Sequence, residues 1–311
     1  MAKSNSFRSG KHLLQVPGPT NIPDRVLRAM SSPTIDHRGP EFAEIVKRVL
    51  DRLRGIFKTT QPIIIFPGSG TGAWEAAIVN TLNPYDKVLM FETGQFSSLW
   101  AEQAKKFNIE VDLVPGDWRT GADPKIVEKK LSEDQSHKIK AVFALHNETS
   151  TGVTSNIAKI RQAMDSAKHP ALLMVDTISS LASIDYCHDD WKVDVTVCGS
   201  QKGLLLPPGL SFNAVSQKAL EAHKKSTMQK SYWDWKPILA NNKDGAFPYT
   251  PPTNMFFGLD EAIDMLNEEG LENVFKRHAR LAEATRVAVK AWGLEILAKN
   301  PDEYSNTITA V

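Results

Sequence analysis

The sequence is poor in several features that would define the class of the protein. It has only 2 cysteines in 311 residues, which excludes a disulfide-stapled fold and favours a reducing compartment. Positive and negative side chains nearly balance, with a net charge of +1, so no overall field attracts nucleic acid or an anionic membrane. No run of about 18 apolar residues is present, and residues 1–11 lack the apolar core of a secretory signal. We therefore expect a cytoplasmic protein without membrane or nucleic-acid partners.

The sequence does contain an ordinary globular composition and a repeating pattern of elements. Its 41% hydrophobic and 23% charged residues exclude a disordered or fibrous chain. Helical patterns separate most of a set of short apolar runs, which predict buried strands over 63–66, 87–91, 111–114, 141–145, 171–175 and 193–198. Runs that are apolar on both faces are typical of strands between two helix layers. The sequence therefore predicts an α/β fold with a mainly parallel sheet.

The two ends of the chain differ from this central part. Prolines in 16–23 predict an ordered arm or turn, because proline cannot sit inside a regular element. Near the other end, the pattern predicts helices over 258–270 and 271–292, then short strands over 294–297 and 305–311. Two short strands cannot bury their own faces without partners. We therefore expect an N-terminal arm over 1–24, a large domain over 25–270 and the start of a truncated small domain over 271–311.

The glycine-rich segment Pro67-Gly68-Ser69-Gly70-Thr71-Gly72 lies between an apolar run and a helical pattern. Glycines let backbone N–H groups close around an anion, and the start of a helix adds partial positive charge. Ser69 or Thr71 could add a hydroxyl donor. The segment lacks the Gly-Lys-Ser/Thr ending of a P-loop, which argues against an ATPase. A tight strand-to-helix turn is the plainer alternative, but three glycines in five residues favour a phosphate site.

A dinucleotide site is the main competing interpretation of the same glycines. Glu92 lies 20 residues after Gly72, at the end of the next apolar run, where an acid that binds ribose belongs. However, the spacing Gly68-x-Gly70-x-Gly72 lacks the last glycine of the dinucleotide fingerprint in register. A nicotinamide-dependent oxidoreductase that uses Gly68–Gly72 and Glu92 therefore stays open as an alternative.

An acid and a lysine follow two other predicted strands. Asp176 closes the run 171–175, where a carboxylate points at the ligand crevice of an open α/β sheet, although a helix N-cap would look the same. Lys202 lies between Gly199 and Gly203, after the run 193–198. A lysine in a poorly solvated crevice can have a lowered pKa, which suits Schiff-base chemistry, whereas most lysines lie on solvated faces.

A phosphate site, a strand-end acid and a loop lysine are together what pyridoxal phosphate requires. The first would bind its phosphate, the acid would keep its ring nitrogen protonated and the lysine would hold its aldehyde. Phe96 could supply a flat face for the ring, or simply pack in the core. Residues 146–152 should lie on the crevice rim, where a polar side chain could reach the phenolic oxygen.

Other segments give weaker signals. The sequence has neither HExxH nor a zinc-spaced cysteine pair, so we expect no metal site. Residues 188–190 have the composition of a solvated turn, and the aromatic segment 232–235 that of a subunit contact or a lid.

Taken together, these motifs resemble the alanine/serine–glyoxylate aminotransferase group of class V, fold type I pyridoxal-phosphate enzymes, and most closely its serine–glyoxylate branch. The resemblance covers essentially the whole chain through the segments 16–23, 70–75, 94–96, 146–149, 199–202 and 248–251. It implies a large domain with a mainly parallel seven-stranded sheet between helices, followed by a small α/β domain. It also implies a homodimer with its sites at the subunit interface.

The resemblance implies a role for each matched residue. Lys202 would be the Schiff-base lysine and proton shuttle, Asp176 would pair with the pyridine nitrogen and Phe96 would stack on the ring. Thr149 would lie near the ring oxygen, and Gly18 would line the substrate pocket. The remaining cofactor contacts would come from Ser69, Gly70, Thr71 and Gln201, with Thr250 and Tyr249 reaching in from the second subunit.

The resemblance also implies an activity. An amino acid, L-serine or L-alanine, would give its amino group to the cofactor, leaving hydroxypyruvate or pyruvate, and glyoxylate would take that group to become glycine. Sulfur-abstracting relatives carry a histidine before the lysine and a reactive loop cysteine, whereas here Gln201 precedes Lys202 and no such loop is visible, which favours transamination. The substrate-carboxylate arginine of the family lies in the small domain beyond residue 311, so a non-catalytic fragment stays open as a second alternative. Some relatives are peroxisomal, but residues 309–311 are no peroxisomal address.

Overall fold

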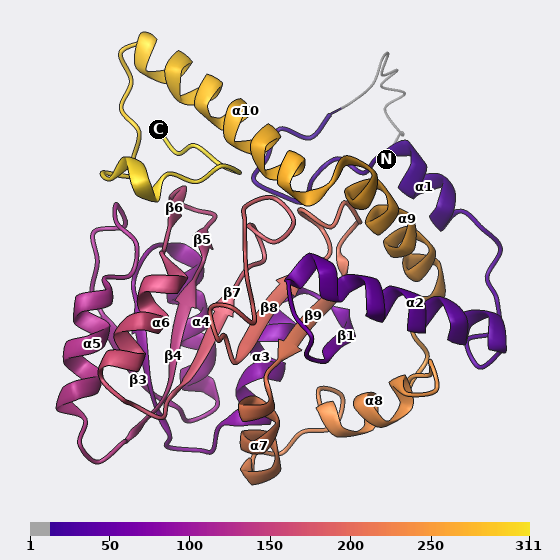
Figure 1. Ribbon diagram of the computed structural model, residues 1–311, viewed down its shortest axis with the longest axis horizontal. Coiled ribbons are helices and arrows are strands. Elements are labelled where there is room, and N and C mark those ends of the chain that lie inside the picture. Colours follow the sequence, from indigo (N-terminus) through magenta and orange to yellow (C-terminus); the bar gives the residue numbers. More distant parts are fainter. Residues whose placement is uncertain (1–12) are drawn as a thin grey trace, which may run out of the picture.

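The computed structural model describes residues 13–311, and the first half of the predicted arm, residues 1–12, lies outside the described residues (Figure 1). The described chain forms a seven-stranded sheet in the order β1-β9-β8-β7-β4-β2-β3. Its strands are β1 (Ile63–Gly68), β2 (Lys87–Phe91), β3 (Glu110–Val114), β4 (Ile139–Leu145), β7 (Leu172–Asp176), β8 (Val195–Gly199) and β9 (Gly209–Val215). Neighbours from β3 to β8 are parallel, and β9 is antiparallel to β8 and β1. The predicted α/β fold with a mainly parallel seven-stranded sheet is confirmed.

Helices cover both faces of this sheet. The first face carries α2 (Pro40–Phe57), α5 (Pro124–Glu133), α6 (Ile157–Ser166) and α9 (Thr253–Glu269), and α1 (Asp24–Met30) packs against α9. The second face carries α3 (Gly70–Thr81), α4 (Gln95–Lys106), α7 (Gln217–Lys225) and α8 (Trp235–Asn242). The long helix α10 (Leu271–Ala291), the two-stranded ribbon of β5 (Asn147–Glu148) and β6 (Val153–Thr154), and the 3-10 helix η1 (Pro301–Glu303) complete the described elements.

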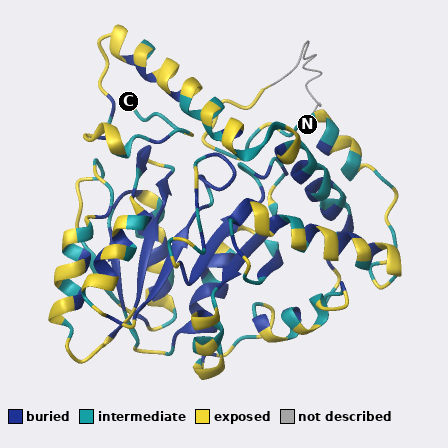
Figure 2. Cartoon of the chain, viewed as in Figure 1, coloured by how far each residue is buried: buried dark blue, intermediate teal, exposed yellow. Residues whose placement is uncertain are grey.

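Two apolar clusters, one on each face, hold the sheet and helices together. Successive residues of a strand point to opposite faces, so Ile63 and Ile65 of β1 belong to one cluster while Ile64 and Phe66 belong to the other. Figure 2 shows the central strands almost wholly buried and the outer helix faces exposed, whereas the edge strand β3 is only partly buried. Burial on both faces is the reason that the strands form continuous apolar runs instead of alternating ones.

The register of the parallel strands brings their carboxyl ends to one edge of the sheet. Leu145, the last residue of β4, pairs with Asp176, the last residue of β7, and Asp176 pairs in turn with Val197 near the end of β8. Polar residues that follow these strands therefore meet at one place. The loop that carries Lys202 starts directly after β8.

Two predictions about strands were wrong. Residues 294–297 and 305–311 form no regular strand; one backbone hydrogen bond, 2.9 Å from Leu297 N to Ala310 O, joins them. A strand needs a continuous ladder, and neither segment lies along an edge of the seven-stranded sheet. Conversely, β9 was not predicted, because Ser211 and Asn213 interrupt its apolar pattern although both are fully buried.

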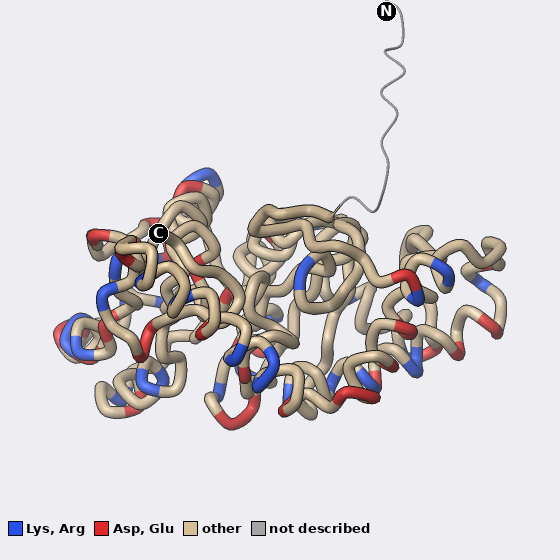
Figure 3. The backbone as a smooth tube through the Cα atoms, turned by 90° about the horizontal axis from the view of Figure 1, so that it is seen from above, with Lys and Arg blue, Asp and Glu red and all other residues tan. Residues whose placement is uncertain are grey.

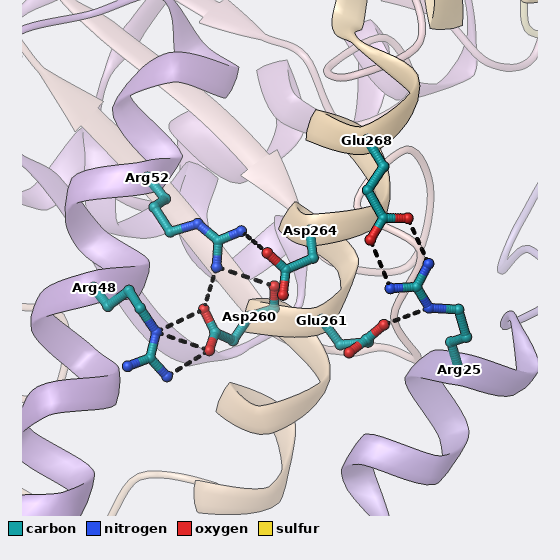
Figure 4. A network of polar contacts seen from close by, with 7 residues as sticks. All are labelled: Arg25, Arg48, Arg52, Asp260, Glu261, Asp264 and Glu268. Carbon is teal, nitrogen blue, oxygen red and sulfur yellow. Dashed lines mark hydrogen bonds and ion pairs between the residues drawn. The ribbon is translucent and has the colours of Figure 1, made fainter.

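Ion pairs join the first helices to α9 (Figure 4). Arg25 of α1 pairs with Glu261 and Glu268, each at 2.6 Å. On α2, Arg48 and Arg52 both contact Asp260 at 2.6 Å, and Arg52 also contacts Asp264. Figure 3 shows that Lys and Arg are interspersed with Asp and Glu in that view. None of the helices within residues 13–311 has the length and apolarity that crossing a membrane would require.

Candidate active site

A cavity of about 220 Å³ lies where β4 and β7 end and α3 begins. Nine of the predicted site residues line it: Gly18, Ser69, Gly70, Thr71, Phe96, Thr149, Asp176, Gln201 and Lys202. These residues are widely separated in the sequence, and the parallel strand order and the N-terminal arm bring them together. We call this space the cofactor cavity.

Lys202 is the lysine of the cofactor cavity. Its Nζ donates to Thr149 Oγ1 at 3.4 Å, and it forms no ion pair with any residue of 13–311. Burial lowers the pKa of Lys202, and the nearby carboxylates of Asp176 and Glu148 oppose this effect. Because an uncharged amine is the nucleophile, this environment suits covalent chemistry at Nζ.

Asp176 lies at the end of β7 and is almost completely buried. Its Oδ1 accepts a hydrogen bond from the Ile178 backbone N–H at 2.7 Å, and its Oδ2 accepts one from Trp74 Nε1 at 2.6 Å. Burial raises the pKa of Asp176 to about 7, against these two hydrogen bonds. A cationic N–H in the cavity would lower that pKa and keep the carboxylate ionised.

The anion-binding end of the cavity is the start of α3. Ser69 is the N-cap residue, and Gly70 and Thr71 form the first turn, which has no acidic side chain. The first N–H groups of a helix have no acceptors within it, so they are available to an anion. A Cβ at Gly70 would lie 2.2 Å from Cδ1 of Ile178, so a larger residue there would displace this side chain of the cavity wall.

Gln201 extends this anion-binding end. Its side-chain Oε1 is buried and has no hydrogen-bond partner within residues 13–311. This oxygen is an acceptor and would not bind a phosphate oxygen, which also accepts; the two N–H groups on Nε2 of the same amide are donors. Because Gln201 lines the cofactor cavity, Nε2 is the atom that would donate to a bound phosphate.

The ring of Phe96 enters the cavity from the first turn of α4. Glu148, which is buried, fixes this turn: its two oxygens accept from the backbone N–H groups of Phe96 at 3.3 Å and Ser97 at 3.0 Å. A carboxylate at the start of a helix also meets its partial positive charge. The orientation of Phe96 thus depends on a residue 52 positions later in the chain.

A second cavity, of about 720 Å³, adjoins the first, and Lys202 and Thr149 line both. We call it the outer cavity. Its other walls come from the arm, from α9 and α10 and from residues 306–309. In Figure 1 the arm and the last residues both lie next to α10. The arm is fixed to the lysine loop because Thr20 N donates to Gln201 O at 3.0 Å.

Some residues that line the cofactor cavity were not predicted from the sequence. Trp74, Asn147, Ile178 and Pro208 also line the cofactor cavity. Trp74 and Asn147 belong to segments that carried the resemblance, so their position gave a signal, but their contacts could not be seen in sequence. Neither Tyr249 nor Thr250 lines the cofactor cavity of the described chain.

The dinucleotide interpretation is wrong. Such a site needs two adjacent parallel strands joined by a helix, whereas four strands separate β1 from β2 in the sheet order. Glu92 does not line the cofactor cavity but accepts a hydrogen bond from Trp118 Nε1 at 3.1 Å.

Two smaller predictions concern segments outside the cavity. Residues 188–190 form the predicted turn, with Asp190 exposed, but His188 is buried and bonds Thr196 Oγ1 at 2.6 Å. In the segment 232–235, Trp235 is buried in the core and Trp233 packs edge-on against Phe66, whereas Tyr232 is exposed and stacks on Tyr249. Both tryptophan rings pack against the apolar cluster on the second face of the sheet. The subunit contact or lid predicted for this segment stays a prediction.

A helix start, a buried acid and a partly buried lysine around one cavity on a mainly parallel sheet define the kind of site that pyridoxal-phosphate enzymes use. Comparison with known proteins supports this assignment of the site. A family model described as Aminotransferase class-V matches residues 12–311. A serine–glyoxylate aminotransferase of Methylorubrum extorquens is 49% identical over 310 residues, which cover 98% of this chain and 77% of that protein.

Two further likenesses extend this result. An L-aspartate–glyoxylate aminotransferase of Paracoccus denitrificans is 44% identical over 297 residues, covering 95% of this chain and 75% of that protein. The crystal structure of an alanine–glyoxylate aminotransferase from Nostoc sp. matches with a TM-score of 0.90 at 27% identity, over 99% of this chain and 81% of that one. The chain belongs to the class V aminotransferase family.

Family membership implies pyridoxal phosphate as the cofactor, and the residues of the cofactor cavity fit it. The N–H groups at the start of α3 and the Nε2 donor of Gln201 suit its phosphate. Asp176 suits its ring nitrogen, and Lys202, which has no carboxylate within ion-pair distance in residues 13–311, suits its aldehyde.

Proposed function

We propose that this chain transfers the amino group of L-serine or L-alanine to glyoxylate, with pyridoxal phosphate as cofactor. The products would be glycine and either hydroxypyruvate or pyruvate. The observation that carries the proposal is that Lys202 lines the cofactor cavity and the outer cavity at once. One amine can then serve the cofactor on one side and the substrate on the other. The likeness to glyoxylate aminotransferases supports this substrate class.

Pyridoxal phosphate, when bound, supplies an aldehyde that takes up amino groups and a ring that withdraws electrons. The residues of the chain bind and orient it. Ser69, Gly70, Thr71 and Gln201 would hold the phosphate, and Phe96 would cover one face of the ring. The carboxylate of Asp176 would hold the proton on the ring nitrogen, which makes the ring a stronger electron acceptor.

Lys202 would move the proton during the reaction. Its Nζ, with a pKa lowered by burial, would take the proton from the α carbon of the substrate and return it one atom along. Thr149 Oγ1, which accepts from Nζ at 3.4 Å, would orient the amine, and Gly18 leaves room beside it.

The outer cavity is the proposed place of the amino acid. It is lined by the polar side chains of Ser179, Ser183, Asn306 and Thr307. These side chains could form hydrogen bonds with the hydroxyl group of an amino acid such as L-serine. The ratio of kcat/KM for L-serine and L-alanine would show which of the two donors this wall favours. A site that hydrogen-bonds a hydroxyl discriminates strongly against the analogue that lacks it.

The decisive experiment is reduction of the purified chain with borohydride after loading with pyridoxal phosphate, followed by peptide mass mapping. We expect the label on Lys202. Lys218 is the matched control, because burial lowers its pKa too, but it lies outside the cofactor cavity and contacts Asp194. A chain without label at Lys202 would refute the proposal.

Two variants extend this test. Lys202→Ala should abolish turnover, and substantial residual transamination would contradict its role. Asp176→Asn should bind the cofactor and react far more slowly, because the ring nitrogen loses its ionic partner. Cofactor binding without turnover in the unaltered chain would favour the alternative of a non-catalytic fragment.

We propose further that the active form is a homodimer in which Tyr249 and Thr250 contact the cofactor of the second subunit. Their position outside the cofactor cavity of their own described chain supports this. We also propose a cytoplasmic protein divided at about residues 24 and 270 into an arm, a large domain and the start of a small domain. Val289, Ile296, Ala298 and Tyr304 form an apolar cluster distinct from the two that cover the sheet, with Val153 of β6 as its one member from the large domain, and this supports the last boundary.

A further inference from the structure

Trp74 contacts the acid of the site and lines the cofactor cavity beside it. It lies on α3, is 3% exposed, and its Nε1 donates to Oδ2 of Asp176 at 2.6 Å. The Ile178 N–H donates to the other oxygen at 2.7 Å. Each carboxylate oxygen thus has one fixed donor, and its remaining lone pairs are left for a ligand in the cofactor cavity.

The indole of Trp74 cannot turn away from Asp176. It stacks on Trp100, with centroids 5.7 Å apart and an interplanar angle of 13°, and Trp100 stacks on Phe143 at 4.4 Å and 26°. Trp100 and Phe143 are almost completely buried. In a close-packed interior such a ring keeps one orientation. An indole N–H is a donor only, so it always presents its hydrogen to the carboxyl group.

The surroundings of Asp176 otherwise oppose its negative charge. Burial raises its pKa to about 7, and Glu148 acts in the same direction. Lys202 acts in the opposite direction. A hydrogen bond to the charged form favours that form, so the N–H of Trp74 lowers the pKa of the carboxyl.

We propose that Trp74 is a positioning residue, whose indole N–H fixes the carboxyl group of Asp176 and keeps it ionised, so that it faces the ring nitrogen of the cofactor as an anion. The proposal rests on the proposed function through the role of Asp176. Trp74 donates to the carboxyl group of Asp176, and its proposed effect passes through that residue.

The test compares Trp74→Phe with Trp100→Phe. The first variant keeps an aromatic ring in the stack and removes the N–H donor to Asp176. The second also removes an indole N–H from the same stack, but Trp100 Nε1 has no hydrogen-bond partner within residues 13–311. Any effect of a smaller ring alone would therefore appear in both variants.

The first readout is the pKa of Asp176 in the cofactor-free protein, measured by infrared titration of the carboxyl band and assigned with Asp176→Asn. Trp74→Phe should raise it by about one pH unit or more, and Trp100→Phe should leave it unchanged. The second readout is the dissociation constant of pyridoxal phosphate from equilibrium dialysis at neutral pH. It should increase roughly tenfold or more in Trp74→Phe only. An unshifted pKa in Trp74→Phe, or equal shifts in both variants, would overturn the proposal.

If Trp74→Phe does not fold, the proposal can be tested on the unaltered protein. The indole N–H resonance of Trp74, identified by its displacement in Asp176→Asn, should titrate with the same midpoint as the carboxyl band. A resonance that shows no inflection would overturn the proposal. Borohydride labelling of Lys202 stays an independent measurement. Labelled Lys202 with an unshifted Asp176 would reject the role of Trp74 alone, and unlabelled Lys202 would reject the proposed function.

Discussion

The side chain of Lys202 crosses Gly18 so closely that a Cβ atom on Gly18 would lie 2.5 Å from Cε of Lys202. Gly18 also has φ of +132°, a conformation that other residues rarely adopt. The arm and the lysine therefore limit each other's position. The backbone hydrogen bond from Thr20 to Gln201 fixes the same contact from the other side.

Gly18→Ala should displace the Lys202 amine and lower kcat/KM roughly 100-fold, because a displacement of about 1 Å near reacting atoms has an effect of this size. Steady-state kinetics with glyoxylate as acceptor would measure it. Gly55→Ala is the matched control: no atom lies within 4 Å of the added Cβ, and alanine in a helix is expected to be neutral or stabilising. Equal activity in the two variants would contradict the prediction.

Glu148→Gln should destabilise the start of α4 by about 1–3 kcal/mol. Both carboxylate oxygens accept N–H groups, so the new amide places a donor against a donor. Urea unfolding would measure the loss. Asp123→Asn at the exposed N-cap of α5 is the control, because asparagine caps a helix as well as aspartate does. A Glu148→Gln protein as stable as this control would show that the cap is unimportant.

His146→Gln should weaken the dependence of stability on pH. Burial lowers the pKa of His146 to about 4, so between pH 6.5 and 4 this histidine is protonated only in the unfolded chain. Its contribution to stability is present above pH 6.5 and is lost as the pH falls to 4, by roughly 3 kcal/mol. Unfolding free energies measured across this range should therefore fall less steeply in the variant. Parallel curves for the two proteins would contradict the prediction.

Asp260→Asn should remove ion pairs to Arg48 and Arg52 and lower the free energy of unfolding by roughly 1 kcal/mol, less in 1 M salt. The effect is small because the arginines are partly exposed. Glu133→Gln, which removes the exposed pair with Lys129 at 4.0 Å, is the control and should have no measurable effect. A loss that does not depend on salt would point to packing instead of charge.

The sequence was informative where the signal is local. Asp176 and Lys202 were recognised because each follows an apolar strand, and in a parallel sheet that position alone places a residue at the ligand edge. Apolar runs identified six of the seven strands in the same way. β9 was missed because Asn213 is buried through bonds to Ala73 and Trp235, partners that only the folded chain supplies.

The residues that hold the site in place were not accessible in this way. Trp74 contacts Asp176, 102 positions later, and Glu148 contacts the turn of Phe96, 52 positions earlier. In the sequence, Trp74 looks like an ordinary helix residue and Glu148 like an ordinary turn residue. Their importance arises from burial and hydrogen bonding, which depend on tertiary packing and leave no periodic pattern.

The pairing of β1 with β9 has a consequence for synthesis of the chain. Ile63 pairs with Ala214, so about 150 residues separate the two partners. Ribosomes add roughly 5–20 residues per second, so the first strand waits on the order of 8–30 seconds for its neighbour. During that interval four consecutive apolar side chains, residues 63–66, leave the ribosome without the strand that shelters them. We expect the nascent chain to need chaperone protection until translation passes residue 215.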